Sequence, residues 1–209
     1  MLKNRMQSSN SLPHFSQGPE KYPADPTIAH FVGRARAGAA FITLGGFEDM
    51  VDAAALPDSV DAAHFPEFDL RNAQCQNYVA ELVEALHAVG SLVSGSLFSA
   101  NKKFRYERKD GTVEIVDASP KAGPGKGMSA MNFQFIGDEV SAKDLVKIAR
   151  SYGQRTRVYK RLGYDAVTVH MSYRAQLPGQ LLSPLSNQRT DEFGRGRMAA
   201  ASRTAAASL

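Results

Sequence analysis

The chain has 209 residues, of which 43% are hydrophobic and 22% charged, so it can bury the core of one large domain or two small ones. Its single cysteine, Cys75, excludes a disulfide within the chain and a cysteine-based metal site. No apolar run approaches the roughly 20 residues that span a bilayer, and the first residues are charged rather than apolar as in a signal peptide, so we expect a cytoplasmic protein without a membrane partner.

A helix followed by a strand is predicted early in the chain. The sequence "NRMQSS" (residues 4–9) is expected to form a short strand, and Asp25 with Pro26 marks the cap and first turn of a helix that ends at Gly38. The apolar face predicted for this helix consists of Ile28, Phe31, Val32 and Ala35. The run "AAFITLGG" (residues 39–46) then has little polar alternation, which is typical of a strand covered on both faces.

The same order of helix and strand recurs in residues 72–98. The sequence "NAQCQNYVAELVEALHAVG" (residues 72–90) has helical periodicity, and "SLVSGSLF" (residues 91–98) follows as a strand. The buried stripe predicted for this helix consists of Tyr78, Leu82, Ala85 and Leu86.

A third unit begins at Ser141, which forms a capping-box-like start with Asp144. The helix closes at Gly163, and the strand "DAVTVH" then delivers His170 at its end. The buried face predicted for this helix consists of Leu145, Ile148, Ala149, Tyr152 and Tyr159. Three such units, each closing its helix on a glycine, predict a parallel α/β sheet with sites at the ends of its strands.

A β-hairpin that leaves the main sheet is predicted between the second and third units. Asp110-Gly111 separates "FRYER" from "TVEIV", and Asp-Gly between such runs is a strong hairpin signal. The densest basic cluster of the chain surrounds this turn and is mixed with Glu107 and Asp110, so we expect a solvated surface and no nucleic-acid partner. The cluster consists of Lys102, Lys103, Arg105, Arg108 and Lys109.

Three stretches carry longer motifs: "LKNRM" (residues 2–6), "YPADPTIAHFVGRARAGAAFITLGG" (residues 22–46) and "GYDAVTVHMSYRAQLPGQLLSPLSNQRTDEFG" (residues 163–194). Together they resemble the old yellow enzyme family, in the branch of NADH:flavin oxidoreductases and 2,4-dienoyl-CoA reductases. The resemblance implies an α/β fold, a TIM (β/α)8 barrel that holds FMN at its C-terminal mouth. Residues 1–194 would then be the N-terminal half of the barrel, about four parallel strands with long βα loops and the hairpin as an excursion.

The resemblance stops at Gly194, after which the family continues with a second glycine and a helix. Residues 195–209, "RGRMAAASRTAAASL", are low in complexity and have almost no large apolar face. We expect a tail there, a weak alanine-rich helix, or sequence read out of frame. The chain is therefore interpreted as a fragment of a longer enzyme.

The resemblance assigns the catalytic residues. His170 would donate a hydrogen bond to the substrate carbonyl at the barrel mouth and stabilise the charge that develops there. The family's usual partner three residues later is His or Asn, and that place is Tyr173 here. Tyr173 is a donor by chemistry and a candidate proton source, although many members carry that tyrosine two residues further on, where this chain has Ala175. A structural role for each residue, as a satisfied histidine or a packed tyrosine, is the alternative.

The resemblance also implies contacts to the flavin. Ser9, Asn10 and Ser11 replace the family's Ala-Pro-Met-Thr segment, so contacts through the backbone are expected there. Gly45 would let the flavin ring approach a strand end, or would simply end the strand. A glutamine usually reads the pyrimidine edge from the third strand, and Ser96 stands at that place with a shorter hydroxyl.

The function implied is an FMN-dependent ene-reductase, in which NADH or NADPH reduces the flavin and an activated C=C of a small enone or enoyl substrate is reduced. A catalytically silent half-barrel without stable flavin binding is the alternative. A basic nucleic-acid-binding protein has only the net charge of +4 in its favour.

Overall fold

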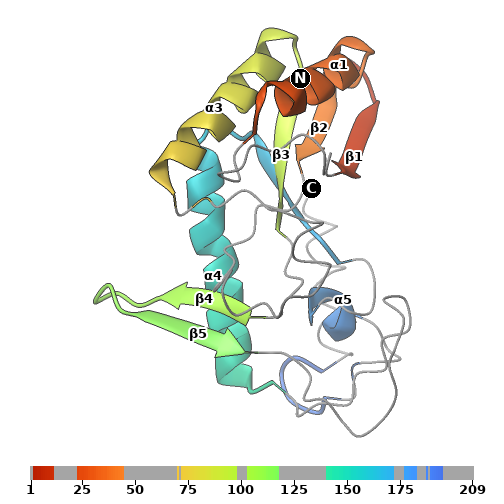
Figure 1. Cartoon of the computed structure of the whole chain (residues 1–209). Helices are drawn as coiled ribbons and strands as arrows, with labels where there is room; N and C mark the ends of the chain where they lie inside the picture. The colour runs from red at the N-terminus through yellow and green to blue at the C-terminus, as the bar shows by residue number, and fades with distance from the viewer. Residues whose placement is uncertain are drawn as a thin grey trace, which may run out of the picture. The chain divides into compact units, whose positions relative to one another are not determined.

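The computed structural model describes residues 2–11, 23–44, 70, 72–97, 103–117, 140–171, 177–182, 187 and 189–194 (Figure 1). The chain divides into two compact units. The first comprises Met1–Phe98 and Tyr152–Val169, and the second comprises Ser99–Ser151 and His170–Leu209. The long βα loop expected at residues 46–69 and the tail expected at residues 195–209 lie outside the described residues.

A parallel four-stranded sheet forms the centre of the first unit. Its strands are β1 (Gln7–Ser11), β2 (Phe41–Leu44), β3 (Leu92–Leu97) and β6 (Ala166–Val169), in the order β1-β2-β3-β6. All three pairings are parallel, which confirms the sheet expected from the helix–strand units. Strands that follow one another along the chain therefore lie next to one another in the sheet, as in the sequential order of a barrel.

Helix α1 (Asp25–Arg36) shows where the local capping prediction was wrong. Its N-cap is Ala24, which has extended backbone angles and makes no side-chain cap, whereas Asp25 is the first helical residue. Asp25 and Pro26 still suit the first turn, because the carboxylate meets the positive end of the helix and proline needs no donor there. The predicted stop is confirmed by Gly38, which has a φ of 115°.

Helix α3 (Ala73–Ala88) buries a stripe that is rotated from the predicted one. Leu82 and Leu86 are buried as expected, whereas Tyr78 and Ala85 are only half-buried. The buried set is Cys75, Val79, Leu82, Val83 and Leu86. This face follows the i, i+4, i+7 spacing of its aliphatic residues, and the large tyrosine ring lies at its border.

Helix α4 (Ala142–Arg161) begins at the predicted capping box. The Ser141 hydroxyl accepts a hydrogen bond from Asp144 N at 3.1 Å and donates one to Asp144 Oδ2 at 2.8 Å. Leu145, Ile148 and Tyr159 are buried as predicted, and Tyr152 is half-buried.

One position of α4 was predicted wrongly. Ala149 is exposed, and Ser151 is buried in its place. The Ser151 hydroxyl donates to Ile148 O at 2.7 Å, which satisfies the serine and removes the penalty of burying it.

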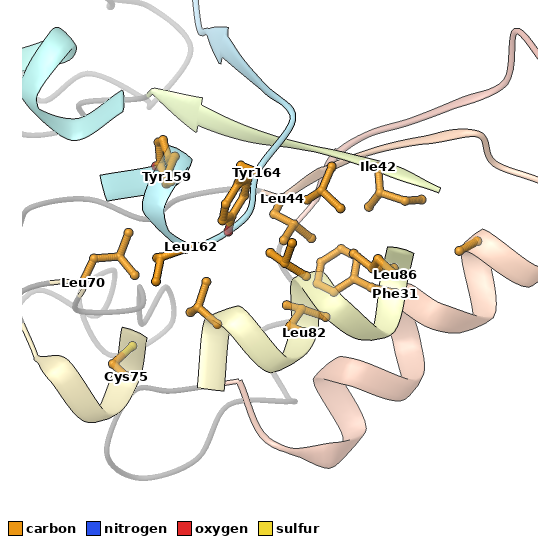
Figure 2. Close-up of a cluster of buried hydrophobic side chains, with 14 of the residues drawn as sticks. Phe31, Ile42, Leu44, Leu70, Cys75, Leu82, Leu86, Tyr159, Leu162 and Tyr164 are labelled. Atoms are coloured by element: carbon orange, nitrogen blue, oxygen red, sulfur yellow. The ribbon is translucent and has the colours of Figure 1, made fainter. Parts of the chain in front are cut away.

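The core of the first unit lies between one face of the sheet and the helices (Figure 2). Ile42 and Leu44 of β2 point toward Leu82 and Leu86 of α3, and Phe31 of α1 packs beside them. Tyr159 and Tyr164 complete the cluster, with ring centroids 4.9 Å apart. All of these side chains are less than 10% exposed, so the helix-facing side of β2 is buried and apolar.

Asp165 aligns the start of β6 with β3. Its Oδ2 atom accepts a hydrogen bond from Val93 N at 2.8 Å and lies 2.9 Å from His87 Nε2. Its own backbone N–H donates to Val93 O at 2.9 Å. The register Ser94↔Ala166 is therefore set by the side chain of Asp165 as well as by the backbone hydrogen bonds between the strands.

The second unit contains the predicted hairpin, formed by β4 (Lys103–Glu107) and β5 (Val113–Asp117) in antiparallel pairing. Asp110 accepts from Thr112 N at 2.9 Å and Gly111 has a φ of 82°, so the Asp-Gly turn is confirmed. Glu114 of β5 accepts from Lys147 Nζ of α4 at 2.5 Å.

Two members of the predicted basic cluster lie beside acidic side chains. Arg108 is paired with Glu114 at 2.7 Å, and Arg105 lies 3.7 Å from Glu107. The hydrogen bonds from Lys147 and Arg108 lower the pKa of Glu114.

The short helix α5 (Leu177–Leu182) also belongs to this unit.

Candidate functional site

The face of the sheet opposite the helices is polar, in contrast to the core face. Side chains alternate along a strand, so the neighbours of Ile42, Val93, Leu97 and Val167 point away from the core. Two side-chain pairs connect adjacent strands there: Gln7 Nε2–Thr43 Oγ1 at 3.0 Å and Ser94 Oγ–Thr168 Oγ1 at 2.7 Å. A third pair, Asn10 Nδ2–Ser96 Oγ at 3.2 Å, connects β1 to β3 across β2. We call this surface the polar face.

A bulge in β1 places Asn10 on the polar face. The register runs Ser8↔Ile42 and then Ser11↔Leu44, so β1 has one residue more than β2 between these pairs. Ser8 accepts from Arg34 Nη1 of α1 at 3.0 Å and therefore faces the helices. In a regular strand Asn10 would share that face, whereas the extra residue turns it to the other one.

Ser96 is fixed from both sides of the sheet. Its hydroxyl accepts from Asn10, and its carbonyl oxygen accepts from Tyr159 Oη at 3.1 Å. The Tyr159 ring fills the space at Gly95, where an added Cβ would lie 2.9 Å from ring carbons. Ser96 and Tyr159 are each 1% exposed, so this part of β3 has little freedom to move.

The structure thus brings together two of the predicted cofactor residues, Asn10 and Ser96, near the C-terminal ends of β1 and β3. Ser9 is exposed, and Ser11 ends β1 opposite Leu44. Gly45 and Tyr173 lie outside the described residues, so their roles remain predictions.

His170 directly follows the last residue of β6, as predicted for a histidine delivered by a strand. The side chain is half-buried. Burial lowers its pKa from the ordinary value of 6.5, so the neutral ring, with one N–H donor and one acceptor, predominates at neutral pH. That its ring faces a ligand remains a prediction.

We expect His170 to titrate below pH 6.5, its ordinary value. A folded pKa below the unfolded value means that the unfolded state binds more protons at intermediate pH. The contribution of His170 to stability is then fully present above the unfolded pKa and is lost as the pH falls through the folded pKa. An NMR titration of the imidazole Cε1–H, assigned with His170→Gln, measures this. A midpoint at or above 6.5 would contradict it.

Within the motif Leu182–Gly194, hydrogen bonds link Asn187 and residues 189–194, which we call the motif loop, to one another and to Leu181. Asn187 is 3% exposed, and its Nδ2 donates to Leu181 O at 2.7 Å and Phe193 O at 2.8 Å. Its Oδ1 accepts from Arg189 N at 3.1 Å. Asn187 therefore holds three points of the loop together.

Arg189 connects this loop to the residue before the capping box of α4. Its Nη1 donates to Val140 O at 2.6 Å, and its Nε donates to Asp191 Oδ1 at 3.0 Å. A second bond joins Arg189 Nη2 to Asp191 Oδ2, and the hydrogen bonds from Arg189 lower the pKa of this carboxyl. At Gly194 a Cβ would lie 2.6 Å from Arg189 O. Sequence reasoning recognised the motif but missed this structural use of its polar residues.

A family model described as the NADH:flavin oxidoreductase / NADH oxidase family matches residues 1–203. The chain belongs to this family. The result confirms the resemblance to old yellow enzymes that the sequence motifs indicated.

Curated relatives of this flavin oxidoreductase chain include an NADPH dehydrogenase of Listeria innocua serovar 6a, 26% identical over 195 residues, with 92% of this chain and 51% of the relative covered. A cinnamate reductase of Clostridium sporogenes is 21% identical over 170 residues, with 80% of this chain and 24% of the relative covered. The chain spans about half the length of the first of these relatives.

A solved structure of morphinone reductase in complex with tetrahydroNAD matches the fold with a TM-score of 0.59 at 20% identity. It covers 95% of this chain, which covers 54% of that structure. The expected α/β half-barrel is thereby confirmed. Within the part of the flavin oxidoreductase chain that the structure describes, no helix has the length and apolar character to cross a membrane.

Proposed function

We propose that the chain is part of an FMN-dependent NAD(P)H oxidoreductase that reduces an activated C=C bond of an enone or enoyl substrate. The observation that carries this proposal is the match of residues 1–203 to the flavin oxidoreductase family. The names of two similar proteins, NADPH dehydrogenase and cinnamate reductase, support a nicotinamide reductant and an unsaturated substrate.

The residues at the strand ends fit a flavin ring in their chemistry. Asn10 offers an exposed carboxamide, and the buried Ser96 hydroxyl holds it in place. Uncharged donors and acceptors of this kind suit the neutral, planar edge of an isoalloxazine ring. Ser9, Ser11 and Gly45 are proposed to contribute backbone groups. When bound, the flavin supplies the hydride that reaches the substrate.

His170 is proposed to orient and polarise the substrate. Its neutral ring donates an N–H to the carbonyl oxygen and stabilises the negative charge that develops on that oxygen. The lowered pKa favours a hydrogen-bond donor over an imidazolium ion at neutral pH. Tyr173 is proposed to donate a second hydrogen bond or to deliver the proton to the α-carbon.

Anaerobic stopped-flow measurements on the 209-residue chain test this proposal. FMN is added, reduced with NADPH and reoxidised with 2-cyclohexen-1-one as the probe. We expect His170→Ala to slow reoxidation about 100-fold, the usual effect of losing one oxyanion-type donor. Tyr173→Phe should slow reoxidation and leave reduction by NADPH nearly unchanged.

His30→Gln serves as the histidine control, because His30 lies on α1 against the ring of Phe31. It should reproduce both half-reactions of the unsubstituted chain. If the chain retains no flavin, the silent half-barrel is the correct interpretation. If flavin is retained and both half-reactions are unchanged in His170→Ala and Tyr173→Phe, the assignment of these two residues is wrong.

A further inference from the structure

We propose that the side-chain amide of Asn10, turned onto the polar face by the bulge in β1 and held by Ser96, binds the imide edge of the flavin ring. This inference rests on the proposed function. It also changes the role expected for Ser96, from a direct flavin contact to a positioning residue.

The orientation of Asn10 is determined by contacts on two strands. The register shift between Ser8 and Ser11 moves it away from the helix-facing side. One N–H of its amide then donates to Ser96 Oγ at 3.2 Å, across 86 residues of sequence. Ser96 has little freedom to move, because it is 1% exposed and its carbonyl oxygen accepts a hydrogen bond from Tyr159 Oη. An asparagine that is itself exposed therefore has a rigid anchor.

The chemistry of the amide matches an imide better than that of the hydroxyl does. A carboxamide has two N–H donors and one carbonyl oxygen, so the bond to Ser96 leaves it a second N–H and that oxygen for a ligand. The flavin pyrimidine presents an N–H between two carbonyl oxygens. A carboxamide can donate to one carbonyl and accept from that N–H at the same time. The Ser96 hydroxyl is buried and already engaged, so it cannot make such a pair.

The position along the strand supports a ligand role over a purely structural one. Asn10 lies next to the C-terminal residue of β1, at the edge where parallel α/β proteins bind their ligands. The pair Gln7–Thr43 links β1 to its neighbour β2 nearer the N-terminal end without a bulge, whereas Asn10 reaches across β2 to Ser96 of β3. A hydrogen bond between polar side chains of β1 and β2 therefore does not require a bulge. The bulge is needed to place the amide of Asn10 on the polar face near the C-terminal ends of the strands.

The test is a titration of the full chain with riboflavin and with FMN, followed by quenching of flavin fluorescence. We expect Asn10→Ala to weaken both ligands by the same factor, about 10-fold, since the contact is to the ring and not to the phosphate. Asn10→Asp, which keeps the shape and removes the donor, should weaken both similarly. Ser96→Ala should cause a smaller loss, about 3-fold, because the amide stays but loses its anchor.

Two controls separate this contact from general damage. Ser94→Ala removes a buried hydroxyl from the same strand and face, bonded to Thr168, and should leave flavin binding unchanged. N3-methylriboflavin lacks the imide N–H, so the unsubstituted chain should bind it weakly and Asn10→Ala should change that binding little. Circular dichroism verifies that each variant is folded.

The possible outcomes are distinct. Equal riboflavin affinity and an unchanged flavin absorbance spectrum in folded Asn10→Ala or Asn10→Asp would overturn the inference and leave the proposed function standing. An equal loss in Ser94→Ala and Ser96→Ala would also overturn it. If the unsubstituted chain binds neither riboflavin nor FMN, both the inference and the proposed function fall.

Discussion

Replacing Gly95 by valine is expected to destabilise the first unit by about 3 kcal/mol or more, the upper range for overpacking a core. An added Cβ would lie 2.9 Å from Cδ2 and Cε2 of Tyr159. That ring is 1% exposed and its hydroxyl is bonded to Ser96 O, so it cannot turn aside without losing the bond. Thermal or urea unfolding monitored by circular dichroism measures the change.

A double-mutant cycle identifies the cause. Tyr159→Leu provides room, so Gly95→Val should cost much less in that background than in the unsubstituted chain. Gly33→Ala on α1 is the glycine control: nothing lies within 4 Å of its added Cβ, and alanine in a helix is favoured by about 0.5–1 kcal/mol. If Gly95→Val costs the same with and without the tyrosine, the clash is not the reason for the glycine.

Replacing Asn187 by alanine is expected to release the motif loop at a cost of about 3 kcal/mol, because each buried polar group left without its bond costs about 1–3 kcal/mol. The side-chain amide donates to Leu181 O and Phe193 O and accepts from Arg189 N, and the residue is 3% exposed. Hydrogen exchange should be faster at the backbone amide of Arg189, which donates to Asn187 Oδ1.

Thr190→Ala is the matched control, because Thr190 lies in the same loop and is exposed. It should leave both the exchange rates and the unfolding free energy within about 0.5 kcal/mol of the unsubstituted chain. If Asn187→Ala behaves like Thr190→Ala, the three bonds of Asn187 do not hold the loop.

The parts of the fold that the sequence predicted correctly depend on neighbours along the chain. The capping box of Ser141 and Asp144 spans four residues, and the Asp110-Gly111 turn spans two. Helix boundaries at Gly38 and Gly163 depend on single residues that tolerate a positive φ. Each of these signals lies within a few consecutive residues, so it could be recognised without knowledge of the tertiary structure.

The errors and omissions arise where residues far apart in the sequence determine which side chains are buried and which contacts they make. Periodicity showed that residues 72–90 form a helix, but the neighbours of that helix decide that Val79, and not Tyr78, lies at the centre of its buried face. The pairing of Asn10 with Ser96 depends on a bulge that no local pattern marks. Likewise, the bond from Arg189 to Val140 O joins residues 49 apart. The motifs indicated the family, whereas the contacts of their side chains required the structure.

Asp165 gives the last strand of the sheet a fixed starting point. Its carboxylate accepts a hydrogen bond from Val93 N, and its own N–H donates to Val93 O. These two bonds fix the register at which β6 begins to pair with β3. Side chains change face with every step along a strand, and only two residues separate Asp165 from Thr168. Inserting a single residue between them would preserve a backbone ladder but exchange the polar and apolar sides, taking Thr168 away from Ser94. The chemistry expected of His170 thus depends on the length of the segment Asp165–Val169 that precedes it as much as on the identity of the histidine.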